Sequence, residues 1–203
     1  MGATVRSCVE LPMRFGMRAK AYTFTWDTEQ PEHLAMRLGA PAGDAPLVRL
    51  HSECLTGDVF GSQRCDCGPQ LQESLFRLHS AGGWLLYLRQ EGRGIGLYNK
   101  LDAYRLQERG LDTFAANRVM HYPDDLRDYG CAAAMLAALG IARVRLITNN
   151  PDKVNQLVAA GIEVVETLST GLYVTGHNRR YLLAKARQAN HALPIEMDEE
   201  EAP

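Results

Sequence analysis

The sequence contains no long apolar run. Met1 to Cys8 hold no apolar segment of the kind found in a secretory signal, and no stretch approaches membrane-spanning length. The chain also has little net charge, −2 at pH 7, which argues against a broad electrostatic grip on nucleic acid. Any phosphate binding should therefore be local. These absences predict a cytoplasmic protein whose thiols are reduced.

Cysteine is scarce, with five among 203 residues, and paired Cys-x-x-Cys units are absent, which disfavours a nucleic-acid-binding zinc finger. Two of the five, Cys8 and Cys131, stand apart, and we expect them to be small core residues. The hydrophobic content of 46% and charged content of 23% are ordinary for a globular enzyme. We expect one domain over residues 1–193, followed by an acidic, disordered tail at 194–203.

The order of apolar segments predicts a mixed, layered α/β core preceded by a β-rich N-terminal portion. Residues 4–26 are dense in β-forming side chains, and from residue 47 onward expected strands alternate with expected helices. The strand at 84–88 is almost continuously apolar, which indicates burial on both faces. Strands are expected at 47–50, 84–88, 144–147 and 162–165, and helices at 69–82, 97–109, 129–139, 151–161 and 181–192.

Three cysteines, Cys54, Cys65 and Cys67, lie in one short stretch. Thiolates are soft ligands that suit zinc, and a turn could aim the last two sulfurs at one point while the first closes the triangle. Three ligands would leave the fourth place of a tetrahedral ion open to water or substrate. A closed structural site with His51 as fourth ligand, and unligated buried thiols, are the alternatives.

A glycine-rich run, Glu91 to Gly96, follows an expected strand and opens an expected helix. Its backbone amides could hold an anion, and Arg93 adds a forked, charged donor. The run matches neither the dinucleotide fingerprint nor the Walker loop, and an ordinary glycine turn is the alternative. The expected strand at 144–147 is followed by a polar segment that begins at Thr148 and places Lys153 near the next helix start. Simple capping of that helix by Asn150 is the alternative.

Other polar residues could carry chemistry. Asp125 and Arg127 lie two apart, so both side chains point the same way in an extended loop, although a surface ion pair would explain them. Tyr104 lies on the apolar stripe of an expected helix, where a core tyrosine is the plain interpretation. Arg49 to Glu53 place polar groups at the end of an apolar strand, beside the cysteines, as in a recognition loop.

Six blocks follow one another along the chain: Arg-Leu-His-Ser-Glu-Cys-Leu-Thr-Gly-Asp, Arg-Cys-Asp-Cys-Gly, Arg-Gln-Glu-Gly-Arg-Gly-Ile-Gly-Leu, Asn-Lys-Leu-…-Ala-Tyr, Asp-Leu-Arg-Asp-Tyr and Leu-Ile-Thr-Asn-Asn-Pro-Asp-Lys-Val. Together they resemble GTP cyclohydrolase II, the enzyme that opens riboflavin synthesis. The likeness covers residues 5–193. Each block alone is modest evidence for the family, but the ordered set is specific to it.

The resemblance implies a hydrolase that opens the imidazole ring of GTP and releases formate and pyrophosphate. It implies one Zn²⁺ per subunit on the three clustered cysteines, Mg²⁺ with the triphosphate, and a homodimer. It implies Asp125 as proton acceptor, Arg127 as the group that attacks the α-phosphorus, and Tyr104 as the active-site tyrosine near guanine. The implied GTP contacts are Arg49, Leu50, His51, Ser52, Glu53, Gln70, Glu91, Gly92, Arg93, Thr113, Thr148 and Lys153.

The chain departs from the family pattern at several positions. Met120-His121 stands where the family commonly has Leu-Gly, Asp102 replaces a usual basic residue, and Ala115 replaces a usual glutamate. These changes touch the loop of the phosphoryl step and the purine pocket. They leave open a paralogue that stops at the formamidopyrimidine without losing formate. A non-catalytic, zinc-stabilised nucleotide-binding module is the third hypothesis.

Overall fold

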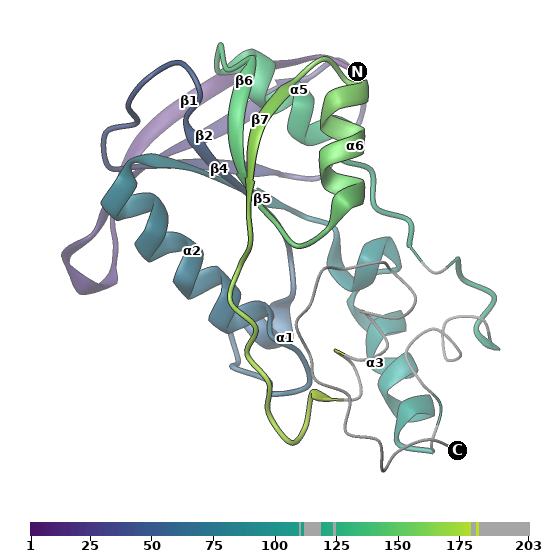
Figure 1. Ribbon diagram of the computed structural model, residues 1–203. Coiled ribbons are helices and arrows are strands. Elements are labelled where there is room, and N and C mark those ends of the chain that lie inside the picture. Colours follow the sequence, from purple (N-terminus) through teal and green to yellow (C-terminus); the bar gives the residue numbers. More distant parts are fainter. Residues whose placement is uncertain (110, 112–118, 124, 180–181, 183–203) are drawn as a thin grey trace.

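The computed structural model in Figure 1 describes residues 1–109, 111, 119–123, 125–179 and 182. Its centre is a seven-stranded mixed sheet in the order β1-β2-β3-β5-β4-β6-β7, which confirms the predicted mixed α/β class. The strands are β1 (Ala3–Pro12), β2 (Arg18–Trp26), β3 (Leu34–Leu38), β4 (Leu47–Ser52), β5 (Gly83–Leu88), β6 (Arg143–Ile147) and β7 (Glu163–Leu168). The helices are η1 (Arg14–Gly16), α1 (Leu55–Asp58), α2 (Cys67–Ala81), η2 (Glu91–Gly94), α3 (Leu97–Gln107), α5 (Gly130–Ala138) and α6 (Pro151–Ala159).

The first part of the sheet is antiparallel, as β1 pairs with β2, β2 with β3, and β3 with β5. Strand β3 was not predicted from the sequence. Its residues, Leu-Ala-Met-Arg-Leu, include no β-branched side chain, so local preference gives little signal. Pairing with β2 on one side and β5 on the other holds it in place.

The second part of the sheet is parallel, because β5, β4, β6 and β7 run in one direction. The carboxyl ends of β5, β4 and β6 therefore lie at one edge of the sheet. The loops that leave them carry the glycine run, the cysteine stretch and Thr148, in that order. Parallel sheets commonly bind ligands outside the carboxyl ends of their strands, so this topology brings three predicted segments together.

Helices cover both faces of the sheet, with α2 on one side and α5 and α6 on the other (Figure 1). Alternate residues of β4 supply both cores: Val48 and Leu50 join the cluster under α5 and α6, whereas Leu47 joins the cluster under α2. Five of the six residues of β5 are buried, which confirms the predicted burial on both faces. The predicted helices at 69–82, 97–109, 129–139 and 151–161 correspond to α2, α3, α5 and α6.

The two isolated cysteines differ in their exposure. Cys8 is exposed, so its prediction as a core residue was wrong: it lies on the edge strand β1, most of whose residues face solvent. Cys131 is buried in α5, as predicted.

The predicted helix at 181–192 and the predicted tail at 194–203 lie outside the described residues, apart from Leu182. Within the described part of the chain, every helix is too short or too polar to span a bilayer.

Candidate active site

A cavity opens at the carboxyl edge of β4, β5 and β6 and gathers most of the residues predicted for the site. Leu50 is fully buried behind the wall, and Asp125 reaches the cavity through its contact with Arg127. Thr113 lies outside the described residues. The predicted residues that line the cavity are Arg49, His51, Ser52, Glu53, Cys54, Cys65, Cys67, Gln70, Glu91, Gly92, Arg93, Tyr104, Arg127, Thr148 and Lys153.

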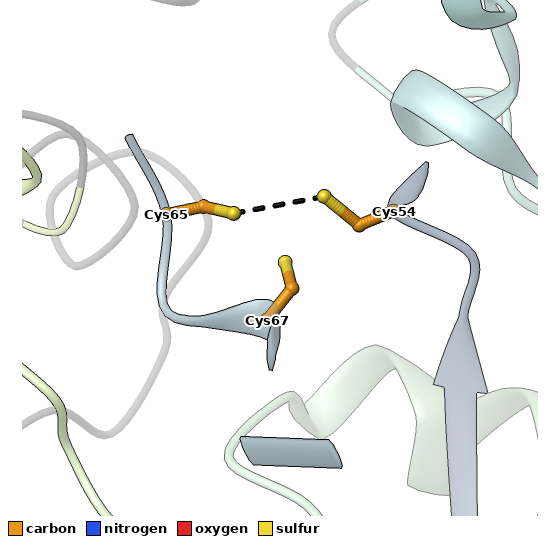
Figure 2. Close-up of side chains that lie close together, drawn as sticks. All are labelled: Cys54, Cys65 and Cys67. Carbon is orange, nitrogen blue, oxygen red and sulfur yellow. Dashed lines mark hydrogen bonds between the residues drawn. The ribbon is translucent and has the colours of Figure 1, made fainter. Parts of the chain in front are cut away.

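The three clustered cysteines point their sulfurs at one centre (Figure 2). The Sγ atoms of Cys54 and Cys65 are 3.6 Å apart, and all three sulfurs lie within 4.8 Å of one another. All three thiols are free, and Cys54 and Cys65 are buried. Cys54 leaves the end of β4, whereas Cys67 begins α2, so the sheet edge and a helix start fix the spacing.

Gly57 packs directly against this cluster. A Cβ atom at residue 57 would lie 3.0 Å from the Cys65 sulfur and 3.1 Å from the Cys54 sulfur, closer than side chains normally pack. It would also lie 3.3 Å from Cβ of Cys67. The space beside the sulfurs therefore exists because this residue has no side chain.

The donor set fits a zinc ion, since three soft thiolates converge on one point. Hydrogen bonds from the Cys65 and Cys67 thiols, followed by the nearby Lys100 ammonium, lower the pKa of Cys54 well below its usual value. His51, the alternative fourth ligand, stands outside the group of ligand atoms, which among the described residues contains the three cysteines.

His51 is instead held by Asp58. The imidazole Nε2 lies 3.0 Å from one carboxylate oxygen of Asp58, and the other oxygen accepts hydrogen bonds from the backbone N–H of Cys54 and from the hydroxyl of Tyr87. Burial, acting against this hydrogen bond, lowers the pKa of His51, so the ring is neutral. A neutral ring that donates through Nε2 leaves Nδ1 as an acceptor.

Arg49 and Lys153 are cations buried at the inner wall. Arg49 donates to the carbonyl of Ile147 at 3.1 Å and to Oε1 of Gln70 at 3.2 Å. Lys153 donates to the carbonyl of Leu50 at 2.7 Å. These bonds join β4 to β6, α2 and α6, so both charges are held in the wall by backbone and amide oxygens.

Asp125 and Arg127 form a hydrogen-bonded ion pair whose guanidinium side lines the cavity. The same loop is attached to the glycine run, because the backbone N–H of Leu126 donates to the carbonyl of Arg93 at 3.0 Å. Arg93 itself adopts a left-handed backbone, with φ of 59°, which a non-glycine residue adopts at a cost. The segment expected to bind phosphate and the segment expected to attack it are thus in contact.

Tyr104 lines the cavity from α3, and the guanidinium of Arg64 lies 4.8 Å from the centre of its ring. Burial raises the pKa of its phenol, so at neutral pH the hydroxyl is protonated and can donate a hydrogen bond. The predicted core-tyrosine alternative is not favoured by this position in a cavity wall.

Several cavity residues were missed by the sequence reasoning. Lys100 is four residues before Tyr104, one helical turn away on the same face, and that spacing could have revealed it. Asn149 and Asn150 follow Thr148 in the polar segment after β6, a strand end already singled out. The missed lining residues are Gln90, Ile95, Lys100, Ala103, Gln107, Asn149, Asn150 and Thr170.

The chain is similar to known proteins over most of its length. The family model for GTP cyclohydrolase II matches residues 4–169. GTP cyclohydrolase-2 proteins of Vibrio parahaemolyticus and Vibrio cholerae are each 48% identical over 197 residues, 95% of this chain and 100% of theirs. The riboflavin biosynthesis protein RibBA of Bacillus cytotoxicus is 50% identical over 190 residues, 92% of this chain and 47% of that protein. The chain therefore belongs to the GTP cyclohydrolase II family of hydrolases.

Proposed function

We propose that this protein is a zinc-dependent GTP cyclohydrolase II, which opens the guanine imidazole ring of GTP and releases formate and pyrophosphate. The observation that carries the proposal is the shared cavity: the three-cysteine cluster, Tyr104 and Arg127 line the same space. Family membership supports the reaction class. Mg²⁺ with the triphosphate, a homodimer and a cytoplasmic location belong to the same proposal through the resemblance.

The base would occupy the part of the cavity beside the cysteines. A zinc ion held by Cys54, Cys65 and Cys67 would supply hydroxide near neutral pH for attack on the imidazole carbon. The apolar side chains of Ile95 and Ala103, both buried and both in the wall, would pack against the purine and keep bulk water away. The protonated Tyr104 hydroxyl would donate a hydrogen bond there.

The triphosphate would extend toward the cations of the wall, Arg93 and Lys153, beside Arg127. A guanidinium is normally protonated, so an attacking Arg127 needs a proton acceptor, and the Asp125 carboxylate is within hydrogen-bond distance. In the proposed step a guanidine nitrogen bonds to the α-phosphorus and the bond to the β-phosphate oxygen breaks. Pyrophosphate leaves, and the guanidinium proton passes to Asp125. Water would then release the nucleotide from the arginine.

The test is to incubate zinc-loaded protein with GTP and Mg²⁺ and to measure formate, pyrophosphate and product mass. One equivalent of formate per GTP is expected. Absence of formate, with a product that retains the formyl group, would identify the early-stopping paralogue. An unchanged guanine spectrum would leave the nucleotide-binding module and overturn the enzyme assignment.

Cys65→Ser tests the metal assignment within the same experiment. It should lose ring opening, whereas Cys8→Ser, an exposed cysteine on β1, should retain it. Pyrophosphate released by Cys65→Ser without formate would show that the two steps are separable. Full ring opening by Cys65→Ser would show that the cysteine cluster is not the reaction centre.

A further inference from the structure

Lys100 extends from the first half of α3 to the cysteine cluster and makes three contacts. Its ammonium lies 3.1 Å from Sγ of Cys54, 3.0 Å from Oγ1 of Thr56 and 2.8 Å from Oε1 of Glu91. An ammonium has three N–H donors, so each donor has one acceptor. The side chain is only 11% exposed, and its position is therefore determined by these three partners.

Glu91 joins the same network from the glycine run, and its side chain is 10% exposed. One carboxylate oxygen accepts the backbone N–H of Leu55 at 2.7 Å, directly after the cluster's first cysteine. The other accepts the backbone N–H of Gly92 at 2.9 Å in addition to Lys100. The glycine run and the cysteine stretch are thus connected by one buried carboxylate.

Charge balance explains why a cation belongs beside this cluster. Three thiolates around a divalent ion carry a net charge of −1, and a charge of that size in a largely buried site needs a counter-charge. An ammonium N–H directed at one sulfur supplies it and also fixes the direction of that sulfur. Hydrogen bonds of this kind to metal ligands orient the ligand and adjust the strength of the metal bond.

We propose that Lys100 is the hydrogen-bonding partner that positions Cys54 for the metal, and that through Glu91 it couples occupancy of the metal site to the order of the glycine run. The inference rests on the proposed function, which places zinc on the cysteines and phosphate at the glycine run. With the ion bound, the Cys54 sulfur is fixed. Lys100 and Glu91 are then fixed in turn, and Glu91 holds the amide of Gly92 in place for an anion.

The first test measures metal binding rather than activity. Zinc affinity, determined by competition with a chromogenic chelator, should fall about ten- to a hundredfold in Lys100→Met. With Co²⁺ in place of zinc, the sulfur-to-metal charge-transfer band should move to longer wavelength, because a sulfur without its N–H donor gives up an electron more easily. Lys20→Met, on β2 with a side chain that is 42% exposed, is the control and should change neither quantity.

The second test measures coupling, with inorganic triphosphate as the probe. By calorimetry, wild-type protein should bind triphosphate at least about fivefold more tightly when loaded with zinc than without it, which is the range of ordinary coupling between sites. In Lys100→Met this difference should vanish. Because the buried Glu91 carboxylate would lose its counter-charge there, the double variant Glu91→Gln/Lys100→Met, which removes both charges, should show the same loss with better folding.

The outcomes separate this inference from the proposed function. Wild-type protein that binds neither zinc nor cobalt through sulfur would overturn the proposed function. Wild-type protein with a sulfur–cobalt band that is unchanged in Lys100→Met, together with unchanged zinc affinity, would overturn the role of Lys100 alone. If Lys100→Met fails to fold, the double variant decides: an unchanged band in the double variant overturns the inference, and a shifted band supports it.

Discussion

The Asp125 carboxylate holds the Arg127 guanidinium at two points. Nε of Arg127 lies 2.8 Å from Oδ1, and Nη2 lies 2.5 Å from Oδ2. The backbone N–H of Arg127 donates to Oδ1 as well, at 3.0 Å. Burial alone would raise the pKa of Asp125, but the hydrogen bonds and charge of Arg127 outweigh it and lower the pKa. The carboxylate is therefore ionised at neutral pH, as a proton acceptor must be.

Arg127→Lys should lower pyrophosphate release by about a hundredfold or more, a usual effect of losing a positioned catalytic group. Lysine keeps the charge but loses the fork that meets both carboxylate oxygens. Pyrophosphate release under saturating GTP is the measurement, and Arg105→Lys, exposed on α3, is the control. Wild-type rates in Arg127→Lys would remove this residue from the proposed phosphoryl step.

Gly57→Ala should weaken metal binding and destabilise the protein by about 1–3 kcal/mol, as overpacking of a filled space does. The new Cβ would lie 3.0 Å from one sulfur of the cluster and 3.1 Å from another, so the ligands must move apart. Zinc content after dialysis and the free energy of unfolding are the measurements. Gly176→Ala is the matched control, because a Cβ at residue 176 would meet nothing within 4 Å. Equal zinc content in the two variants would show that the metal site tolerates a side chain at residue 57.

His33 should make the protein less stable in acid. Burial, followed by the charge of Arg89, lowers the pKa of His33 from 6.5 to about 4. Between these values the unfolded chain binds a proton that the folded chain does not. Stability is therefore complete above pH 6.5 and falls as the pH decreases toward 4, by up to about 3 kcal/mol.

The measurement is the free energy of unfolding at a series of pH values in wild type and in His33→Gln. The substitution should reduce the slope between pH 6.5 and 4 by about 1.4 kcal/mol per pH unit, since one titrating group is removed. It should also lower stability at neutral pH, because Nδ1 of His33 accepts the backbone N–H of Arg89. An identical slope in the two proteins would show that His33 titrates equally in the folded and unfolded states.

The sequence was sufficient to predict a site residue where its chemistry, or its position after a strand end, distinguishes it from its neighbours. The close spacing of Cys65 and Cys67 predicted converging sulfurs, and polar residues after apolar strands predicted the cavity wall. The parallel order of β5, β4 and β6 then explains why these segments meet. Such signals come from residues that are close together in the chain, so they can be recognised in a single sequence.

The parts that escaped prediction depend on contacts between distant segments. Lys100 lies 46 residues from the sulfur it contacts, so its spacing from Tyr104 could place it in the cavity wall but could not show this contact. The contacts of Asp58 with Tyr87 and His51 likewise join separate segments and could not be predicted. Cys8 is exposed because β1 is an edge strand. The order of the strands in the sheet determines this, and the local sequence pattern does not show it.

His121 has a left-handed backbone, with φ of 60°, and an exposed side chain. For an L-residue the left-handed conformation costs on the order of 1 kcal/mol. His121→Gly should therefore relieve strain, offset in part by the greater freedom of glycine in the unfolded chain. The net gain should be a few tenths of a kcal/mol up to about 1 kcal/mol, or roughly 1–4 °C in melting temperature.

His121→Ala separates relief of strain from loss of the imidazole. Alanine retains a Cβ, so it should show no gain, and only glycine should raise the melting temperature. If both variants gain equally, the histidine side chain and not its backbone is unfavourable. If neither gains, the left-handed conformation at residue 121 carries no strain. Formate yield in the glycine variant should equal that of wild type.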